Sequence, residues 1–148
     1  MHYLYDETFE GFLTCVHRHY YMEKADGIFP IARYQTDLVT ACQPVKTDAE
    51  KARAVYGAIA QKISAHDLER TYRVFRSNAE NKESLLLSYL RLGFKYGPRI
   101  RLMHAHPVVS EVEKAERRVG NEVHRLCGLI RFSVTRSAAS VAEEAKCG

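Results

Sequence analysis

Apolar residues recur at intervals of three and four over most of this chain, and that spacing constrains its fold more than any other feature. The spacing is typical of α-helices that bury one face. Short stretches in which apolar and polar side chains alternate are typical of β-strands instead. The sequence predicts helices over residues 7–24, 48–63, 65–77, 82–96 and 108–126, strands over residues 2–6 and 129–134, and an undecided extended segment over residues 38–42.

These elements define one domain. With 148 residues the chain is long enough to bury a core, and its 46% apolar fraction separates it from disordered chains. We therefore expect a single α+β domain over residues 2–134, mostly helical, with about five helices and one or two short strands. Residues 135–148 are small and polar and lack an apolar face, so we expect a disordered or truncated tail there.

Turn and capping residues mark the ends of the predicted helices. Gly27 breaks the first helical pattern, and the pair Gly97-Pro98 ends the helix of residues 82–96. Thr47, followed three residues later by Glu50, forms a capping box. This box predicts that Thr47 is the N-cap of the second helix.

Each predicted helix has an apolar face that we expect to be buried. Phe94 lies on the far side of its helix, so it must meet a second neighbour or be exposed. The expected buried residues are Ala52, Val55, Tyr56, Ile59 and Ile63 in the second helix, Leu68, Tyr72 and Phe75 in the third, and Leu85, Leu86, Tyr89, Leu92 and Tyr96 in the fourth.

Positive charge is concentrated in one third of the chain. Residues 91–136 hold ten Lys and Arg against four Glu, a net charge of +6, whereas residues 1–90 carry a net charge of −1. A pI near 8.9 fits contact with nucleic acid, although many basic proteins bind none. The uneven distribution predicts a surface that meets a polyanion.

The helix of residues 108–126 is predicted to present much of this charge. Positions advance by about 100° along a helix, so Val112, Ala115 and Val119 share one side while Arg117 and Arg118 lie on the other. A basic face held in solvent can reach phosphates without disturbing the core. The expected phosphate contacts are Lys95, Arg99, Arg101, Lys114, Arg118, Arg125 and Arg131, with His124 as a further member.

The same helix supports an alternative interpretation. Glu113 and Arg117 are spaced i,i+4, as are Arg118 and Glu122. Such pairs often only solubilise a surface helix and add a few tenths of a kcal/mol of stability. The basic residues are then ordinary surface groups, and both interpretations stay open.

No residue pattern in the sequence predicts a catalytic centre, a metal site or a cofactor. The pairs His104-x-His106 and His17-x-His19 lack the carboxylate and cysteine partners that would complete a metal site. Glycine-rich phosphate loops and nucleophile elbows are missing. We therefore predict no intrinsic activity in this chain.

Targeting signals and membrane spans are not predicted either. No segment approaches the ~20 continuous apolar residues that a membrane helix needs, and the amino-terminal residues lack the basic and apolar regions of a signal peptide. The four cysteines match no metal or disulfide framework. We expect a cytoplasmic protein with reduced thiols.

Four segments of the chain read YLYDETFEGFLTCV, VKTDAEKARAVY, YLRLGFKYG and EVHRLCGLIRF. Together they resemble a bacterial family of uncharacterised DNA-metabolism proteins, and the last segment is the most specific. The resemblance covers about residues 2–132. In that family the domain lies beside, or is fused to, a uracil-DNA glycosylase, and it is associated with a radical-SAM protein of DNA repair or modification.

The resemblance implies an accessory role and supplies no catalytic residues. The chain lacks the C-x-x-x-C-x-x-C motif of radical-SAM enzymes and the four-Cys arrangement of iron–sulfur glycosylases. Family members continue with more sheet and helix after the last segment, whereas this chain turns into SVTRSAASVAEEAKCG. We therefore expect a truncated or divergent end, with residues 129–134 as an edge strand open to pairing.

Three functions follow as hypotheses. The leading one is a non-catalytic module that binds DNA and serves a glycosylase or radical-SAM partner. The second is a protein–protein scaffold whose basic helix docks an acidic partner. The third is enzymatic, and requires additional chain to complete a site around His104, His106 and His124.

Overall fold

The computed structural model describes residues 1–36 and 38–119. The predicted strand of residues 129–134, the tail, and the candidate contacts His124, Arg125 and Arg131 lie outside these residues. The strands are β1 (His2–Tyr5), β2 (Gly27–Pro30) and β3 (Cys42–Pro44), the α-helices are α1 (Phe9–Tyr21), α2 (Ala49–Lys62), α3 (Ala65–Phe75) and α4 (Lys82–Tyr96), and the 3-10 helices are η1 (Ile31–Arg33) and η2 (Gly97–Leu102). A further helix occupies residues 107–119.

The three strands form one parallel sheet in the order β2-β1-β3. β1 pairs with β2 from His2 opposite Gly27, and with β3 from His2 opposite Cys42. Helices cover the side chains of β1: Tyr5 packs against Phe12 of α1 and Phe75 of α3, and both Tyr3 and Tyr5 are almost fully buried. The parallel arrangement requires crossover connections, and α1 provides the one between β1 and β2.

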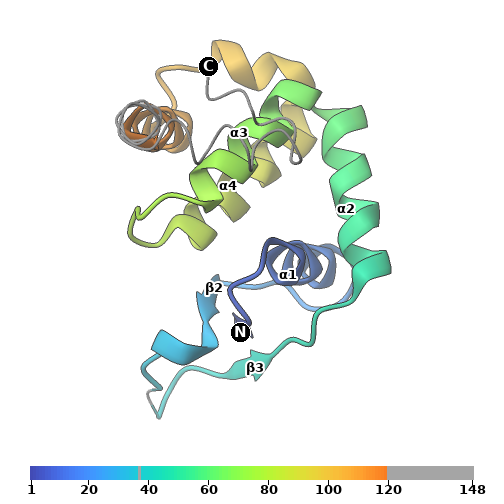
Figure 1. The fold of residues 1–148 in the computed structure, drawn as a ribbon, viewed down its shortest axis with the longest axis vertical. Coiled ribbons are helices and arrows are strands. Elements are labelled where there is room, and N and C mark those ends of the chain that lie inside the picture. The colour runs from blue at the N-terminus through green and yellow to red at the C-terminus, as the bar shows by residue number, and fades with distance from the viewer. Residues whose placement is uncertain (37, 120–148) are drawn as a thin grey trace, which may run out of the picture.

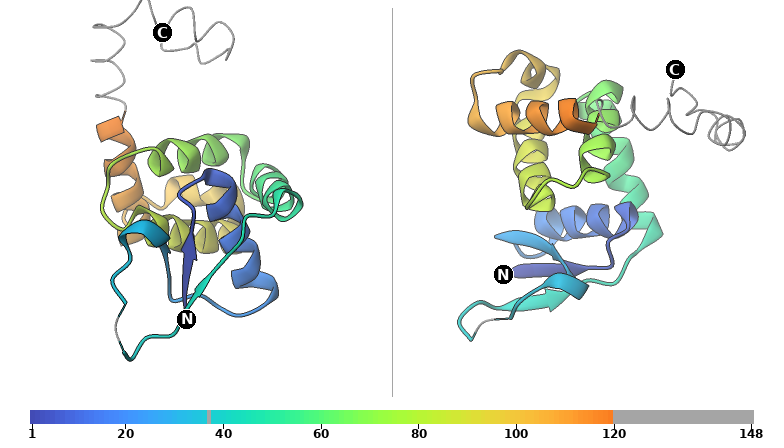
Figure 2. Two further views of the ribbon diagram at one scale, coloured as in Figure 1. Left: turned by 60° about the horizontal axis from the view of Figure 1, so that its bottom comes forward. Right: turned by 60° about the vertical axis from the view of Figure 1, so that its left-hand side comes forward.

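The helices are stacked on this small sheet (Figure 1). α1 lies between the strands and the remaining helices, as the right-hand view of Figure 2 shows, and α2 packs against it. α4 reaches the sheet at its first turn, where the Tyr5 hydroxyl donates to Glu83 at 2.5 Å and the Ile28 amide donates to Ser84 at 3.4 Å. The core therefore extends without interruption from the sheet into the helices.

Aromatic rings join three of these elements. Phe75 of α3 lies 5.6 Å from Phe12, 5.2 Å from Phe9 and 6.1 Å from Tyr5, measured between ring centroids. Tilted and edge-to-face pairs of this kind stabilise a core by about 0.5–1.5 kcal/mol each beyond their burial. This cluster attaches α3 to α1 and β1.

The predicted class, α+β and mostly helical, is confirmed. The described residues hold three strands, whereas the sequence predicted one or two. β2 and β3 span only four and three residues and contain Pro30 and Pro44. Such short strands with proline at an edge carry too little alternation to be recognised. The helix of residues 82–96 has the predicted bounds.

Two local predictions were wrong. The N-cap of α2 is Asp48, whose carboxylate accepts from the amides of Glu50 and Lys51, and Thr47 instead donates its hydroxyl to Asp6. α4 is rotated from the expected face. Leu86 and Tyr89 are buried as predicted, and Leu87 and Leu90 are buried too, whereas the expected Leu85, Leu92 and Tyr96 are only half-buried. Three consecutive leucines at residues 85–87 had left the helical phase ambiguous.

Two tyrosines that we expected in the core are about half exposed. Tyr56 is 50% exposed and Tyr72 is 42% exposed. The Tyr72 ring packs edge-on against Phe9 at 5.1 Å, while its hydroxyl accepts from Arg76. A tyrosine at the margin of a core buries its ring and keeps its hydroxyl near water, so the apolar spacing overstated its burial.

The turn from β1 into α1 is held by the Asp6 carboxylate. It accepts hydrogen bonds from the amide and the hydroxyl of Thr8 and from the hydroxyl of Thr47. Burial opposes ionisation of Asp6, but these hydrogen bonds outweigh it and lower its pKa. Gly11 lies beneath this carboxylate, where a Cβ atom would overlap the Asp6 oxygen.

Two glycine substitutions should therefore have opposite effects. Gly57, inside α2, has open space around it, so Gly57→Ala should stabilise the protein by about 0.5–1 kcal/mol through helix propensity. Gly11→Ala should destabilise it by about 1–2 kcal/mol because the Asp6 hydrogen bonds must break or shift. Urea denaturation measures both. Equal effects of the two changes would contradict the described packing around Gly11.

His19, at the end of α1, should make stability depend on pH. Its side chain is 4% exposed, and its Nδ1 accepts from the Ala25 amide at 2.9 Å. Burial first, and then the charges of Arg91 and Lys24, lower its pKa. The unfolded chain therefore binds the proton more readily, and the stability that neutral His19 supports is lost as pH falls below about 6.5.

We expect the free energy of unfolding to decrease between about pH 7.5 and pH 5.5. The decrease should be smaller in His19→Gln, because that variant removes a group that resists protonation. His66→Gln is the matched control, since His66 is exposed on α3. Identical pH profiles for the two variants would refute the role given to His19.

Candidate functional site

The helix of residues 107–119 presents the basic face that the sequence predicted. Val112, Ala115 and Val119 are buried as expected. In the first turn Val109 is fully buried, and Val108 is half-buried. The exposed residues of the opposite side are Glu111, Lys114, Arg117 and Arg118.

The glutamates of this helix have partners other than its arginines. Glu116 accepts from Arg70 at 2.8 Å and lies 3.5 Å from Arg73, both on α3. Glu113 lies 2.6 Å from His104 Nδ1. The alternative pairing of Glu113 with Arg117 is not present, and within residues 1–36 and 38–119 no carboxylate pairs with Arg117 or Arg118. Their charges therefore stay at the surface.

Lys114 is the exception on this face. Its ammonium group lies 3.5 Å from Glu111, and both side chains are about half exposed. A surface pair of this kind contributes at most about 1 kcal/mol. It nevertheless offsets the charge of Lys114, which makes this residue a weaker phosphate contact than Arg118.

The remaining described candidates precede this helix. Lys95 lies in the last turn of α4, with its ammonium group 5.2 Å from the Tyr96 ring centroid, and Arg99 and Arg101 lie on η2. All three are exposed. η2 and the helix of residues 107–119 are joined by a short turn at the end of the molecule away from the sheet (Figure 1). The five described candidates thus lie on three elements that follow one another along the chain.

A buried polar network holds the basic helix in place. The Tyr89 hydroxyl donates to Asp67 at 2.7 Å and accepts from Arg70 at 3.1 Å, and Arg70 donates to Glu116 at 2.8 Å. Asp67 also accepts from Ser64 at 2.6 Å. Burial, followed by the hydrogen bond to Asp67, raises the pKa of Tyr89. The network joins α3, α4 and the helix of residues 107–119.

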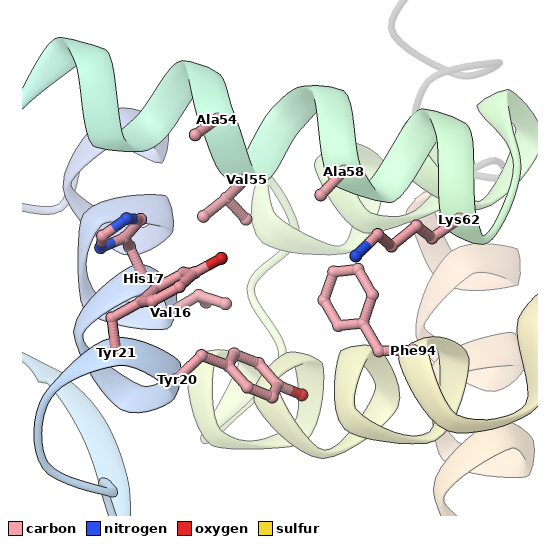
Figure 3. Close-up of a pocket in the computed structure, with 9 residues that line it drawn as sticks. All are labelled: Val16, His17, Tyr20, Tyr21, Ala54, Val55, Ala58, Lys62 and Phe94. Atoms are coloured by element: carbon pink, nitrogen blue, oxygen red, sulfur yellow. The ribbon is translucent and has the colours of Figure 1, made fainter.

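A second candidate site is a cleft between α1, α2 and α4 (Figure 3). Its volume is about 320 Å³, at the lower end of the range of small-molecule sites. Figure 3 shows Ala54 and Ala58 on the α2 wall, where their small side chains leave space. The residues that line the cleft are Val16, His17, Tyr20, Tyr21, Ala54, Val55, Ala58, Lys62 and Phe94.

Aromatic rings form two sides of this cleft. Tyr20 meets Phe94 edge-on at 5.6 Å, and His17 stacks on Tyr21 at 4.4 Å. Phe94 thus has the second neighbour that its position on α4 required. Tyr20 and Tyr21 remain 45% and 75% exposed, so open aromatic surface lies at the cleft.

The charges around the cleft are mainly positive. Lys62 directs its ammonium group toward the space above Phe94 (Figure 3). Burial lowers the pKa of His17, with Lys51 adding to the effect and Asp48 opposing it, so this imidazole is neutral at pH 7. Burial raises the pKa of Tyr20, against the charge of Arg91.

Sequence reasoning missed this cleft. Its walls come from three helices, and no spacing along one of them predicts a cavity. The available signals were the position of Phe94 on the far face of its helix and the small residues Ala54 and Ala58 one turn apart. Neither signal indicates which helix faces them.

The histidine pairs do not assemble a metal site. Across the described residues, no three His, Cys, Asp or Glu side chains gather closely enough to hold a metal ion. His104 bonds to Glu113, His106 accepts from the Val108 amide, and His19 accepts from Ala25.

None of the helices described is long and apolar enough to span a membrane.

A small parallel sheet covered by helices, with a basic helix at the opposite end, defines an α+β protein. Residues 80–145 match the model of a family described as a domain of unknown function, DUF4130. The match covers less than half of the chain and includes α4, η2 and the basic helix. No curated protein and no solved structure matches the chain.

Removing the Tyr89 hydroxyl should measure the strength of the buried network. Tyr89→Phe leaves Asp67 and Arg70 each without one partner, and we expect a loss of about 1–3 kcal/mol in urea denaturation. Tyr56→Phe, at an exposed position, should change stability by less than about 0.5 kcal/mol. Equal stability of the two variants would mean that the network does not anchor these helices.

Proposed function

We propose that this chain is a non-catalytic accessory module of DNA repair or DNA modification, which binds nucleic acid through its basic surface. The proposed contacts are Lys95, Arg99, Arg101, Lys114, Arg118, His124, Arg125 and Arg131, of which the last three lie outside the described residues. The observation that carries the proposal is the engagement of Glu113 and Glu116 by residues outside the basic face. Arg117 extends the surface, because it is exposed beside Arg118 and is unpaired in the described part of the chain.

The physical basis is electrostatic. A helix whose arginines are not neutralised by adjacent glutamates attracts phosphates, and each phosphate contact releases condensed counterions. Contacts to the backbone position a protein without reading sequence. The module should therefore bind DNA with low sequence preference and strong dependence on salt.

The partner in this proposal comes from the resemblance. The chain shares the segment EVHRLCGLIRF and three others with the family described above, in which the domain accompanies a uracil-DNA glycosylase and a radical-SAM protein. Such a partner would supply the chemistry, and this module would add affinity for the nucleic acid. Linked binding sites of this kind raise overall affinity without new contacts at the catalytic site.

A protein scaffold is the second candidate function. Leu102 is 78% exposed next to Arg101 on η2, and an apolar side chain beside basic ones suits an acidic protein surface as well as DNA. Retention of a purified acidic partner after nuclease treatment, together with no DNA retardation at low salt, would favour this candidate.

Charge reversal tests the nucleic-acid proposal. Arg118→Glu combined with Arg125→Glu should weaken binding to duplex and single-stranded oligonucleotides, and reduce the slope of log affinity against log salt by about 1–2. Lys46→Glu combined with Arg53→Glu, at exposed positions outside the basic surface, is the charge-matched control. Circular dichroism checks that both variants are folded. Equal affinity of both double variants for DNA at low salt would refute the surface.

A further inference from the structure

We propose that the cleft between α1, α2 and α4 binds a single unstacked nucleotide, with its base between the aromatic rings and its phosphate at Lys62. This inference deepens the proposed function and rests on it for the source of the nucleotide, which is a nucleic-acid strand. The occupant is defined by three features of the cleft, which are its rings, its charge and its size.

The rings favour a flat ligand. Tyr20, Tyr21 and Phe94 line the cleft, and stacking of a base on an aromatic side chain is worth about 1–3 kcal/mol whatever the base. Tyr21 is 75% exposed, so its ring is available to a ligand at the cleft. The His17 imidazole, held neutral by burial, adds a polar ring edge without adding charge.

The charges around the cleft favour an aromatic ligand that carries a phosphate over a cationic ligand. An aromatic pocket alone would also suit a cationic ligand, such as a quaternary ammonium group. Lys62 lines this cleft, and Arg91 and Lys51 act on its residues Tyr20 and His17, while Asp48 is the opposing charge near His17. A cation would be repelled here, whereas a ring that carries a phosphate satisfies both the aromatic side chains and Lys62.

The size and position of the cleft limit the ligand to one nucleotide within a strand. A volume of about 320 Å³ admits one base with its sugar and leaves the rest of a strand outside. Phe94 in the cleft is followed directly by Lys95, and then by Arg99 and Arg101 on η2. The end of α4 therefore leads from the cleft to Lys95, Arg99 and Arg101, where the next phosphates of the same strand can bind.

Titration with deoxyadenosine monophosphate tests the cleft apart from the basic surface. The methyl resonances of Ala54 and Ala58 should shift on saturation, because the bound base changes the ring currents at the α2 wall. Lys62→Gln should weaken binding of the nucleotide about fivefold and leave that of deoxyadenosine unchanged. Arg53→Gln, on the same helix and not in the cleft lining, should match the unmodified protein.

Ala58→Leu fills the cleft and should weaken nucleotide binding at least about tenfold. Gly57→Ala is its control, because a Cβ there meets open space. Phe94→Leu removes a ring while keeping an apolar side chain, and it serves if Ala58→Leu does not fold. Unshifted methyl resonances at millimolar nucleotide, or undiminished binding in a folded Ala58→Leu or Phe94→Leu variant, would overturn the proposal.

Oligonucleotides separate the two proposals and the two sources of nucleotide. An abasic single strand keeps the phosphates and should bind the basic surface without shifting Ala54, whereas a strand that carries bases should shift it. Salt-dependent DNA binding with no shift would support the basic surface and overturn the cleft. Shifts with the free mononucleotide alone would overturn a strand as the source.

Discussion

The polar groups that α4 buries must each have a hydrogen-bond partner, and this requirement sets the positions of the elements around it. Glu83, in the first turn, accepts from Tyr5 of the central strand. Tyr89, two turns later, joins Asp67 and Arg70 of α3. A buried polar group without a partner costs about 1–3 kcal/mol. A rotation of α4 would therefore break its contacts with the sheet and with α3 at once.

Both proposed binding surfaces depend on this anchored helix. Arg70 extends the buried network to Glu116, which orients the helix of residues 107–119 so that Arg117 and Arg118 face solvent. The opposite side of α4 contributes Phe94 to the aromatic cleft. The polar interactions that stabilise the fold thus also engage Glu116, so that its carboxylate does not pair with the arginines of the basic face. A separate role in catalysis is not needed to explain the burial of Asp67, because Tyr89 and Ser64 satisfy it.

The spacing of apolar residues predicted an element well where one face of that element packs against the core. The bounds of the helix of residues 82–96 and the buried positions Val112, Ala115 and Val119 are confirmed, because an apolar stripe on a helix follows from spacing alone. Prediction was weaker where an element packs against several neighbours, or where it is too short to show a regular spacing of apolar residues. The phase of α4, the N-cap at Asp48 and the short strands β2 and β3 were not recovered, since each depends on contacts with distant segments. Of the proposed phosphate contacts, the five described ones are exposed as predicted, and their binding role stays a prediction.

The sequence by itself determined the helical character of the chain and the concentration of positive charge in residues 91–136, because both are properties of residue order. It also determined that Arg117 and Arg118 lie opposite the buried stripe. Only the tertiary structure decided which charges remain unpaired, because Glu116 meets Arg70 from α3 and Glu113 meets His104 from the preceding turn. The cleft was decided in the same way. Its rings and its lysine belong to helices separated by many residues in the sequence, and only packing brings those helices together.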